Sequence, residues 1–192
     1  HLMCDALNED AVRRLRERKQ RDSKPFAVMF RDMDCLREYC STGAEEAEEL
    51  RSWRRPIVIL DQKKTLAYPV SNGLRTTGAM LPYMPFHYLM FRYIKTPAVV
   101  LTSGNLSGEP VIKDDKAAAV DLGGISDGMV HYNREIVNRC DDSVVRVIDH
   151  KPVLIRRSRG YVPRPVDLSA DAEGILALGA EQKSTFCMGR GN

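Results

Sequence analysis

Ten residues at 101–110, LTSGNLSGEP, combine two glycines with two serines, a threonine and an asparagine. They stand between an apolar run at 97–101 and a predicted helix at 114–122. Backbone N–H groups at such a turn can converge on an anion, and Ser103 and Asn105 add side-chain donors. The stretch contains neither GxxxxGK[ST] nor GxGxxG. On composition alone, an ordinary polar connection is as good an explanation as phosphate binding.

Two basic clusters also suit phosphate. The first precedes a predicted strand and consists of Lys19, Arg21 and Lys24; the second is RRSRGY at 156–161. Arginine forks bind phosphate well, and a tyrosine can stack on a base. A solvated helix end explains the first cluster equally well. The second would also suit single-stranded RNA, although a net charge of +3 gives a nucleic-acid groove little support.

Nothing in the sequence indicates a catalytic nucleophile or a resident metal. The five cysteines lack CxxC spacing, so we predict neither disulfides nor zinc, but buried or partly buried thiols. The histidines show no HxxxH or HExxH spacing, and His87 is predicted to pack in a helix. The pair Asp141 and Asp142 fits magnesium binding or turn capping equally well.

The elements that must position these residues alternate between helix and strand. Helices are predicted after Asn8, from Asp32 to Leu36, and at 44–53, 85–91 and 114–122; strands are predicted at 26–30, 57–60 and 97–101. A hairpin is predicted from 143–148 and 153–157, with a turn at 149–152. The pattern indicates an α/β fold with a twisted sheet of mixed parallel and antiparallel strands, covered by helices.

The chain is predicted to contain more than one unit. Residues 1–162 form the α/β domain, and the proline-containing stretch at 163–174 has the composition of a linker. A new strand at 175–180 then opens the segment 175–192, which is too short to fold alone. We expect this segment to be the truncated start of a second domain.

Bulk composition fits a soluble, cytoplasmic protein. Of the 192 residues, 43% are hydrophobic and 29% charged, which is ordinary for a globular chain. No apolar run is long enough to cross a bilayer. No basic and apolar leader opens the sequence. These features predict neither a membrane nor a nucleic-acid partner.

Taken together, the clusters resemble a known family. Lys19-x-Arg21, the stretch at 102–108, Ser143-Val-Val and the RSRG at 157–160 resemble the YrdC-like nucleotide-binding domain. Five longer blocks resemble the HypF family of carbamoyltransferases in [NiFe]-hydrogenase maturation: KPFAVMFRDMD, LTSGNLSGEP, NRCDDSVVRV, RRSRGYVPRP and LALGAEQKSTFC. They occur in collinear order over nearly the whole chain.

The resemblance implies that ATP and carbamoyl phosphate, through carbamate, form a carbamoyl-adenylate. The carbamoyl group would then pass to the C-terminal cysteine of the partner protein HypE, towards a cyanide ligand of the hydrogenase. Magnesium would shield the triphosphate, and no protein nucleophile or zinc is needed. The implied ATP- or phosphate-binding residues are Lys19, Arg21, Lys24, Thr102, Ser103, Asn105, Ser143, Arg157 and Arg159.

The resemblance also implies that the chain is a fragment. The acylphosphatase and zinc modules of the family are not present, and His1 already follows the family's glycine-rich strand end. Residues 175–192 resemble only the first strand and turn of the transferase domain. Two alternative functions stay open: a threonylcarbamoyl-adenylate synthase for tRNA modification, and a non-catalytic RNA-binding module.

Overall fold

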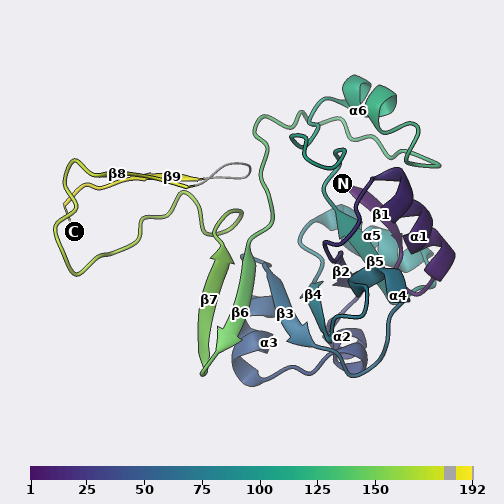
Figure 1. The fold of residues 1–192 in the computed structure, drawn as a ribbon, viewed down its shortest axis with the longest axis horizontal. Coiled ribbons are helices and arrows are strands. Elements are labelled where there is room, and N and C mark those ends of the chain that lie inside the picture. The colour runs from purple at the N-terminus through teal and green to yellow at the C-terminus, as the bar shows by residue number, and fades with distance from the viewer. Residues whose placement is uncertain (180–184, 192) are drawn as a thin grey trace.

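The computed structural model describes residues 1–179 and 185–191. In chain order they form β1 (Leu2–Asp5), α1 (Glu9–Arg18), β2 (Ala27–Phe30), α2 (Met33–Tyr39), α3 (Ala44–Arg51), β3 (Ile57–Asp61), α4 (Tyr68–Ser71), β4 (Thr76–Met80), α5 (Pro85–Tyr93), β5 (Ala98–Thr102), α6 (Asp115–Asp121), β6 (Val144–Ile148), β7 (Lys151–Arg156), β8 (Leu176–Leu178) and β9 (Phe186–Met188) (Figure 1). No helix among these residues is long and apolar enough to cross a membrane.

Seven of the strands build one twisted sheet in the order β1-β5-β2-β4-β3-β6-β7. The pairs β2–β4 and β3–β6 are parallel, while the other neighbours are antiparallel. The predicted mixed α/β fold is therefore confirmed. The sheet brings the end of β5 and the β6–β7 hairpin into one structure, although about 40 residues separate them in the chain.

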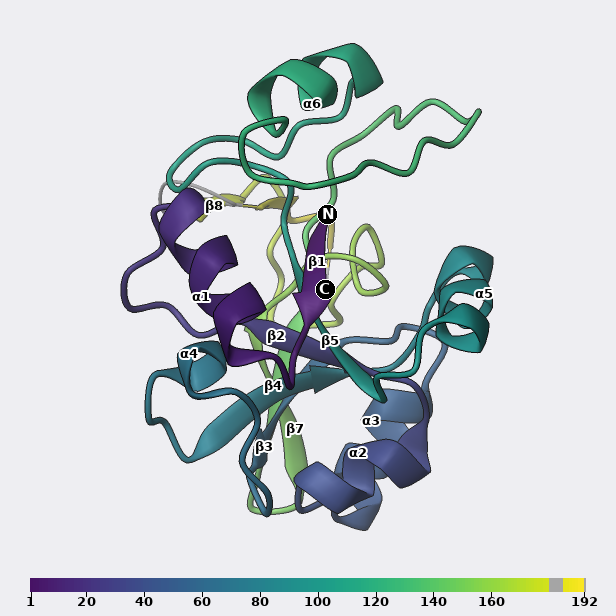
Figure 2. The same ribbon diagram turned by 90° about the vertical axis from the view of Figure 1, so that its right-hand side faces the viewer.

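Each face of the sheet has its own apolar cluster, because successive side chains of a strand point to opposite faces. Val28 and Phe30 of β2 belong to the larger cluster, with residues of α1, α2, α3 and α4. Met29 belongs to a smaller cluster, with Met90 and Phe91 of α5. Figure 2 shows α5 on the opposite side of the sheet from α1 and α4.

The face under α5 is only partly covered. Ala27 in β2, Gly78 in β4 and Ile59 in β3 are register partners, and all three are half-buried although their strands lie in the interior of the sheet. A Cβ at Gly78 would lie 3.0 Å from Cγ2 of Ile57, so only glycine keeps this surface flat. We call these three residues the open sheet face.

Local capping explains where three of the helices begin. The side chains of Asn8, Asp32 and Asp114 accept hydrogen bonds from the backbone N–H groups three residues later, at 3.0, 2.8 and 2.8 Å. The predicted starts of these helices are confirmed. Their ends differ: α2 continues to Tyr39 instead of Leu36, and α3 stops at Arg51 instead of residue 53.

The hairpin turn is shorter than predicted. Asp149 and His150 alone form it, with φ of 47° and 61°, which matches a two-residue turn between right-twisted strands. Lys151 and Pro152 already belong to β7, where they pair with Ile148 and Val147. The predicted turn at 149–152 is wrong by two residues.

The C-terminal part lies apart from the main sheet. Strands β8 and β9 pair only with each other and extend away from the seven strands (Figure 1). The strand predicted at 175–180 is present as β8, and Ala180 lies outside the described residues. The division into a domain at 1–162, a linker at 163–174 and a second unit at 175–192 stays a prediction.

Candidate functional site

Lys19, at the end of α1, lies beneath the loop that follows β5. Its side chain is 1% exposed. Its Nζ donates to the carbonyl oxygens of Ser103 and Asn105, at 2.7 and 2.5 Å, and to Oδ1 of Asn105 at 3.1 Å. A buried ammonium requires such acceptors. Lys19 therefore fixes the conformation of the loop, and its predicted contact with phosphate stays a prediction.

The loop itself is closed by its own side chains. Oγ of Ser103 donates to Oδ1 of Asn105 at 2.5 Å, and Nδ2 of Asn105 donates to the carbonyl oxygens of Leu106 and Glu109 at 2.8 and 2.6 Å. Asn105 is buried, as is Thr102, which pairs with Leu2 of β1. Much of the polarity that the sequence shows here maintains the loop structure.

A second polar group forms where β6 begins and β7 ends. Ser143 is fully buried; its Oγ accepts from the backbone N–H of Ser158 at 2.7 Å and donates to the carbonyl oxygen of Arg159 at 2.9 Å. Nε of Arg156 donates to the carbonyl oxygen of Asp142 at 2.8 Å. These bonds continue the hairpin beyond its strands and fix the backbone at 156–159.

Arg159 is held from several sides. Its Nη2 and Nε donate to Oδ1 of Asp142 at 2.7 and 3.1 Å, and its terminal nitrogens donate to the carbonyl oxygens of Arg54 and Arg55 at 3.2 and 3.0 Å. The guanidinium also lies 3.8 Å from the ring centroid of Tyr83. An arginine has five N–H donors, so most of them are already used.

The other predicted cations occupy different positions. Nη2 of Arg157 donates to the carbonyl oxygens of Tyr161 and Arg164, which turns it towards the following loop. Lys24 is exposed. Nε and Nη2 of Arg21 donate to the carbonyl oxygens of Lys24 and Pro25, at 3.1 and 2.8 Å.

Arg21 lies in a positively charged environment. Its pKa is lowered, first by burial and then by the charges of Arg16 and Arg156. The structure thus couples the basic end of α1 to the end of β7, two segments that sequence alone could not place together.

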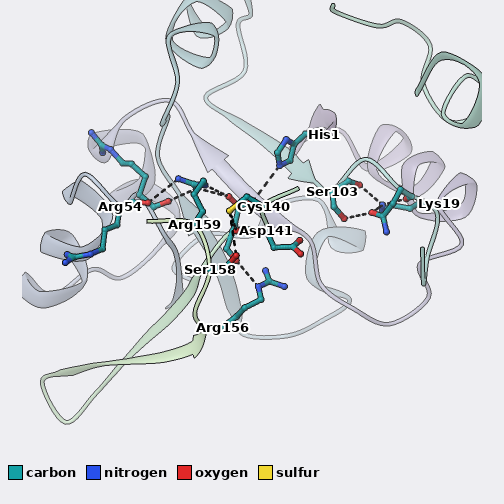
Figure 3. A network of polar contacts seen from close by, with 12 residues as sticks. His1, Lys19, Arg54, Ser103, Cys140, Asp141, Arg156, Ser158 and Arg159 are labelled. Carbon is teal, nitrogen blue, oxygen red and sulfur yellow. Dashed lines mark hydrogen bonds and ion pairs between the residues drawn. The ribbon is translucent and has the colours of Figure 1, made fainter. Parts of the chain in front are cut away.

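The two polar groups meet at His1. Its Nε2 lies 3.9 Å from Oδ2 of Asp142, and Figure 3 shows Lys19 and Ser103 on one side of His1 and Arg159 with Arg54 on the other. Of the nine predicted residues, Lys19, Ser103 and Asn105 contact one another, as do Ser143 and Arg159.

Sequence reasoning missed three residues of the second group. Asp142 could be read as a magnesium ligand or a cap, whereas its carboxylate pairs with Arg159. Arg156 was indistinguishable from its neighbours in the run RRSR. Tyr83 gave no signal, since its contact with Arg159 depends on the placement of α5.

Next to Tyr83, His87 is buried in α5 as predicted. The two rings pack edge to face, with centroids 4.5 Å apart. Nδ1 of His87 has no hydrogen-bond partner, and burial lowers the pKa of the imidazole to about 4. The side chain is therefore neutral at physiological pH.

The cysteines depart in part from the prediction. All five are free thiols, but Cys140 and Cys187 are exposed rather than buried. Burial raises the pKa of Cys4 and of Cys40 to about 12. Within residues 1–179 and 185–191, no group of three or more His, Cys, Asp or Glu side chains is placed to hold a metal ion.

A hollow of about 1610 Å³ lies between β1, α5 and the segment that carries α6. Its lining is mainly apolar, with Met3, Phe86 and Leu122 among the contributors, and none of the nine predicted site residues lines it. Size alone is therefore a poor guide to the site, and the polar groups around the open sheet face are the better candidate.

Comparison with known proteins gives the class first. A family model of Sua5, YciO and YrdC proteins, described as "Telomere recombination", matches residues 1–158. The match covers most of the chain, so the chain belongs to the Sua5/YciO/YrdC family.

A more particular likeness is to the carbamoyltransferase HypF. The chain is 43% identical over 198 residues to HypF of Rhizobium leguminosarum bv. viciae, covering 100% of this chain and 26% of that protein. A crystal structure of full-length HypF in a phosphate- and nucleotide-bound form superposes with a TM-score of 0.93 at 46% identity, covering 100% of this chain and 30% of that one. The predicted resemblance to HypF, an enzyme, is confirmed. The chain spans about a quarter of the length of the curated relatives that it matches.

The alternative enzyme is a more distant relative. The structure of P. abyssi Sua5 with L-threonine has a TM-score of 0.71 at 23% identity, covering 81% of this chain and 46% of that one. At this identity the likeness shows a shared fold only.

Proposed function

We propose that this chain forms carbamoyl-adenylate from MgATP and carbamate, with carbamoyl phosphate as the source of the carbamate. The observation that carries the proposal is the similarity to HypF over the whole of the chain. The polar groups on either side of His1 support it, because they gather serine, asparagine and arginine side chains at the ends of β5 and β7.

The reaction balances without a protein nucleophile. Carbamoyl phosphate loses its phosphate to water and leaves carbamate. A carbamate oxygen then attacks the α-phosphorus of ATP, the bond from that phosphorus to the bridging oxygen breaks, and pyrophosphate leaves. The chain's contribution is to hold the two reactants in line and to neutralise the charge that develops on the phosphates.

Each predicted residue has a distinct part in this proposal. Arg21 and exposed Lys24 supply positive charge for phosphate, while Lys19, Ser103 and Asn105 shape the loop whose backbone amides face the ligand. Asp142 holds Arg159 and is already engaged by that guanidinium, so magnesium arrives with ATP as part of the substrate.

In the complete enzyme, the carbamoyl group would pass to the C-terminal cysteine of HypE for hydrogenase maturation. Both the acceptor and the transfer belong to the proposal, because the chain corresponds to only 26% of its HypF relative.

ATP-dependent pyrophosphate release tests the proposal. One reaction contains carbamoyl phosphate, a second contains threonine and bicarbonate, and a third contains ATP alone. Release that depends on carbamoyl phosphate is expected. Release only with threonine and bicarbonate would move the chain to threonylcarbamoyl-adenylate synthesis. Release in neither reaction, together with salt-dependent RNA binding, would favour the RNA-binding alternative.

A further inference from the structure

Arg156 lies on the same side of the sheet as the open sheet face. It pairs in register with Val144 of β6, and residues opposite each other on antiparallel strands point to the same side. Val144 and Ala27 both pack against the apolar cluster under α5. The side chain of Arg156 therefore belongs to the face that contains Ala27 and Gly78.

Arg21 borders this face from the other end. Its bonds to the carbonyl oxygens of Lys24 and Pro25 anchor it just before β2, of which Ala27 is the first residue. The anchoring of Arg156 is similar, because its Nε donates to the carbonyl oxygen of Asp142. Both guanidiniums are thus fixed by backbone carbonyls and retain terminal N–H groups for another acceptor.

The pair has no carboxylate partner in the described part of the chain. Arg13, Arg18 and Arg159 form ion pairs with acidic side chains, whereas the ion pairs of the described residues include neither Arg21 nor Arg156. The positive charge of Arg156 lowers the pKa of Arg21, so the two charges repel each other at short range. Like charges held together in this way favour an anion between them.

The surface between them suits a bulky anion. Ala27 and Gly78 leave no side chain beyond a methyl group above the strands, and both residues are half-buried. Arg159, the residue that the sequence indicated at the same hairpin end, has most of its donors occupied.

We propose that Arg21 and Arg156 form a two-arginine clamp that binds the phosphates of the nucleotide over Ala27 and Gly78, with Arg159 as the residue that positions the loop next to it. The location of the phosphates rests on the proposed function, but binding of an inorganic anion does not.

Thermal unfolding with inorganic pyrophosphate tests the clamp directly. Ligand that binds only the folded state raises Tm. Pyrophosphate should raise the Tm of the wild type and should raise it much less in Arg21→Ala and Arg156→Ala. The matched control is Arg37→Ala, which removes the same charge from an exposed position of α2, on the opposite side of the sheet. Its response should equal that of the wild type.

Calorimetric titration with MgATP gives the second readout. Losing one charge-assisted contact should weaken ATP binding by about tenfold to a hundredfold in either variant. Arg156→Lys, which keeps the charge and the fold but loses the fork, should fall between the wild type and Arg156→Ala.

The outcomes separate the clamp from the proposed function. Wild-type affinity for pyrophosphate and ATP in folded Arg156→Ala, or in Arg156→Lys and Arg21→Ala if that variant does not fold, overturns the clamp and leaves the proposed function intact. Pyrophosphate binding that requires both arginines, without any pyrophosphate release from ATP and carbamoyl phosphate, supports the clamp and overturns the proposed function.

Discussion

Asp142→Ala removes the carboxylate that holds Arg159. The carboxylate accepts two hydrogen bonds from the guanidinium, at 2.7 and 3.1 Å, and the two side chains are only 14% and 25% exposed. Without Asp142, Nε and one Nη2 donor of Arg159 lose their acceptor in a site with limited access to water. The carbonyl bonds to Arg54 and Arg55 would stay.

The size of the effect follows from this partial burial. A hydrogen bond to a charged group contributes about 1.5–3 kcal/mol, and breaking a fully buried pair costs about 3–5 kcal/mol. For a pair with this exposure we expect a loss of about 2–3 kcal/mol in the free energy of unfolding. In a chain of this length that corresponds to a fall in Tm of about 4–12 °C.

Differential scanning calorimetry checks the value, with Asp127→Ala as the control. Asp127 pairs with Arg18 at 2.9 Å, almost the same distance, but its side chain is 77% exposed. Solvent screens such a pair, so its removal should leave Tm unchanged within error. An equal fall in Tm for the two variants would refute the reasoning, because burial would then not distinguish the pairs.

Three further predictions follow from burial. Lys19→Met should lower both Tm and ATP affinity because it leaves the loop oxygens without a donor, whereas Lys24→Met should lower only ATP affinity; equal Tm values would contradict this difference. The pKa of His87, about 4 when folded and about 6.5 when unfolded, means that this group weakens folding progressively as pH falls from about 6.5 to 4, by roughly 3 kcal/mol in total. In urea unfolding, His87→Leu should therefore lose less stability than the wild type between pH 7 and pH 4.5, and parallel losses would contradict the assignment. A thiol reagent at neutral pH should label Cys140 and Cys187 first, as mass spectrometry would show, and faster labelling of the buried thiols would be the contrary result.

Local signals made much of the fold predictable. Asn8 and Asp32 cap their helices through contacts within four residues, so the sequence contains all the information needed. The strand β4, TTGAM, was not predicted, because it lacks apolar alternation and includes Gly78. Its place as an interior strand depends on its pairing with β2 and β3, which is a tertiary property.

The candidate site was predictable in composition but not in geometry. Lys19 and Lys24 look equivalent in the sequence, yet one is buried under a loop and the other exposed. In the run RRSR, the roles of Arg156 and Arg159 are decided by Asp142, whose carbonyl orients the first and whose carboxylate holds the second. No spacing rule reports such a partner.

A crystal structure of the chain with MgATP would test the location of the site most directly. The phosphates should lie between Arg21 and Arg156, above Ala27 and Gly78, with the loop at 103–105 beside them. Phosphates bound in the hollow between β1, α5 and the α6 segment, away from both arginines, would contradict the location proposed for the site.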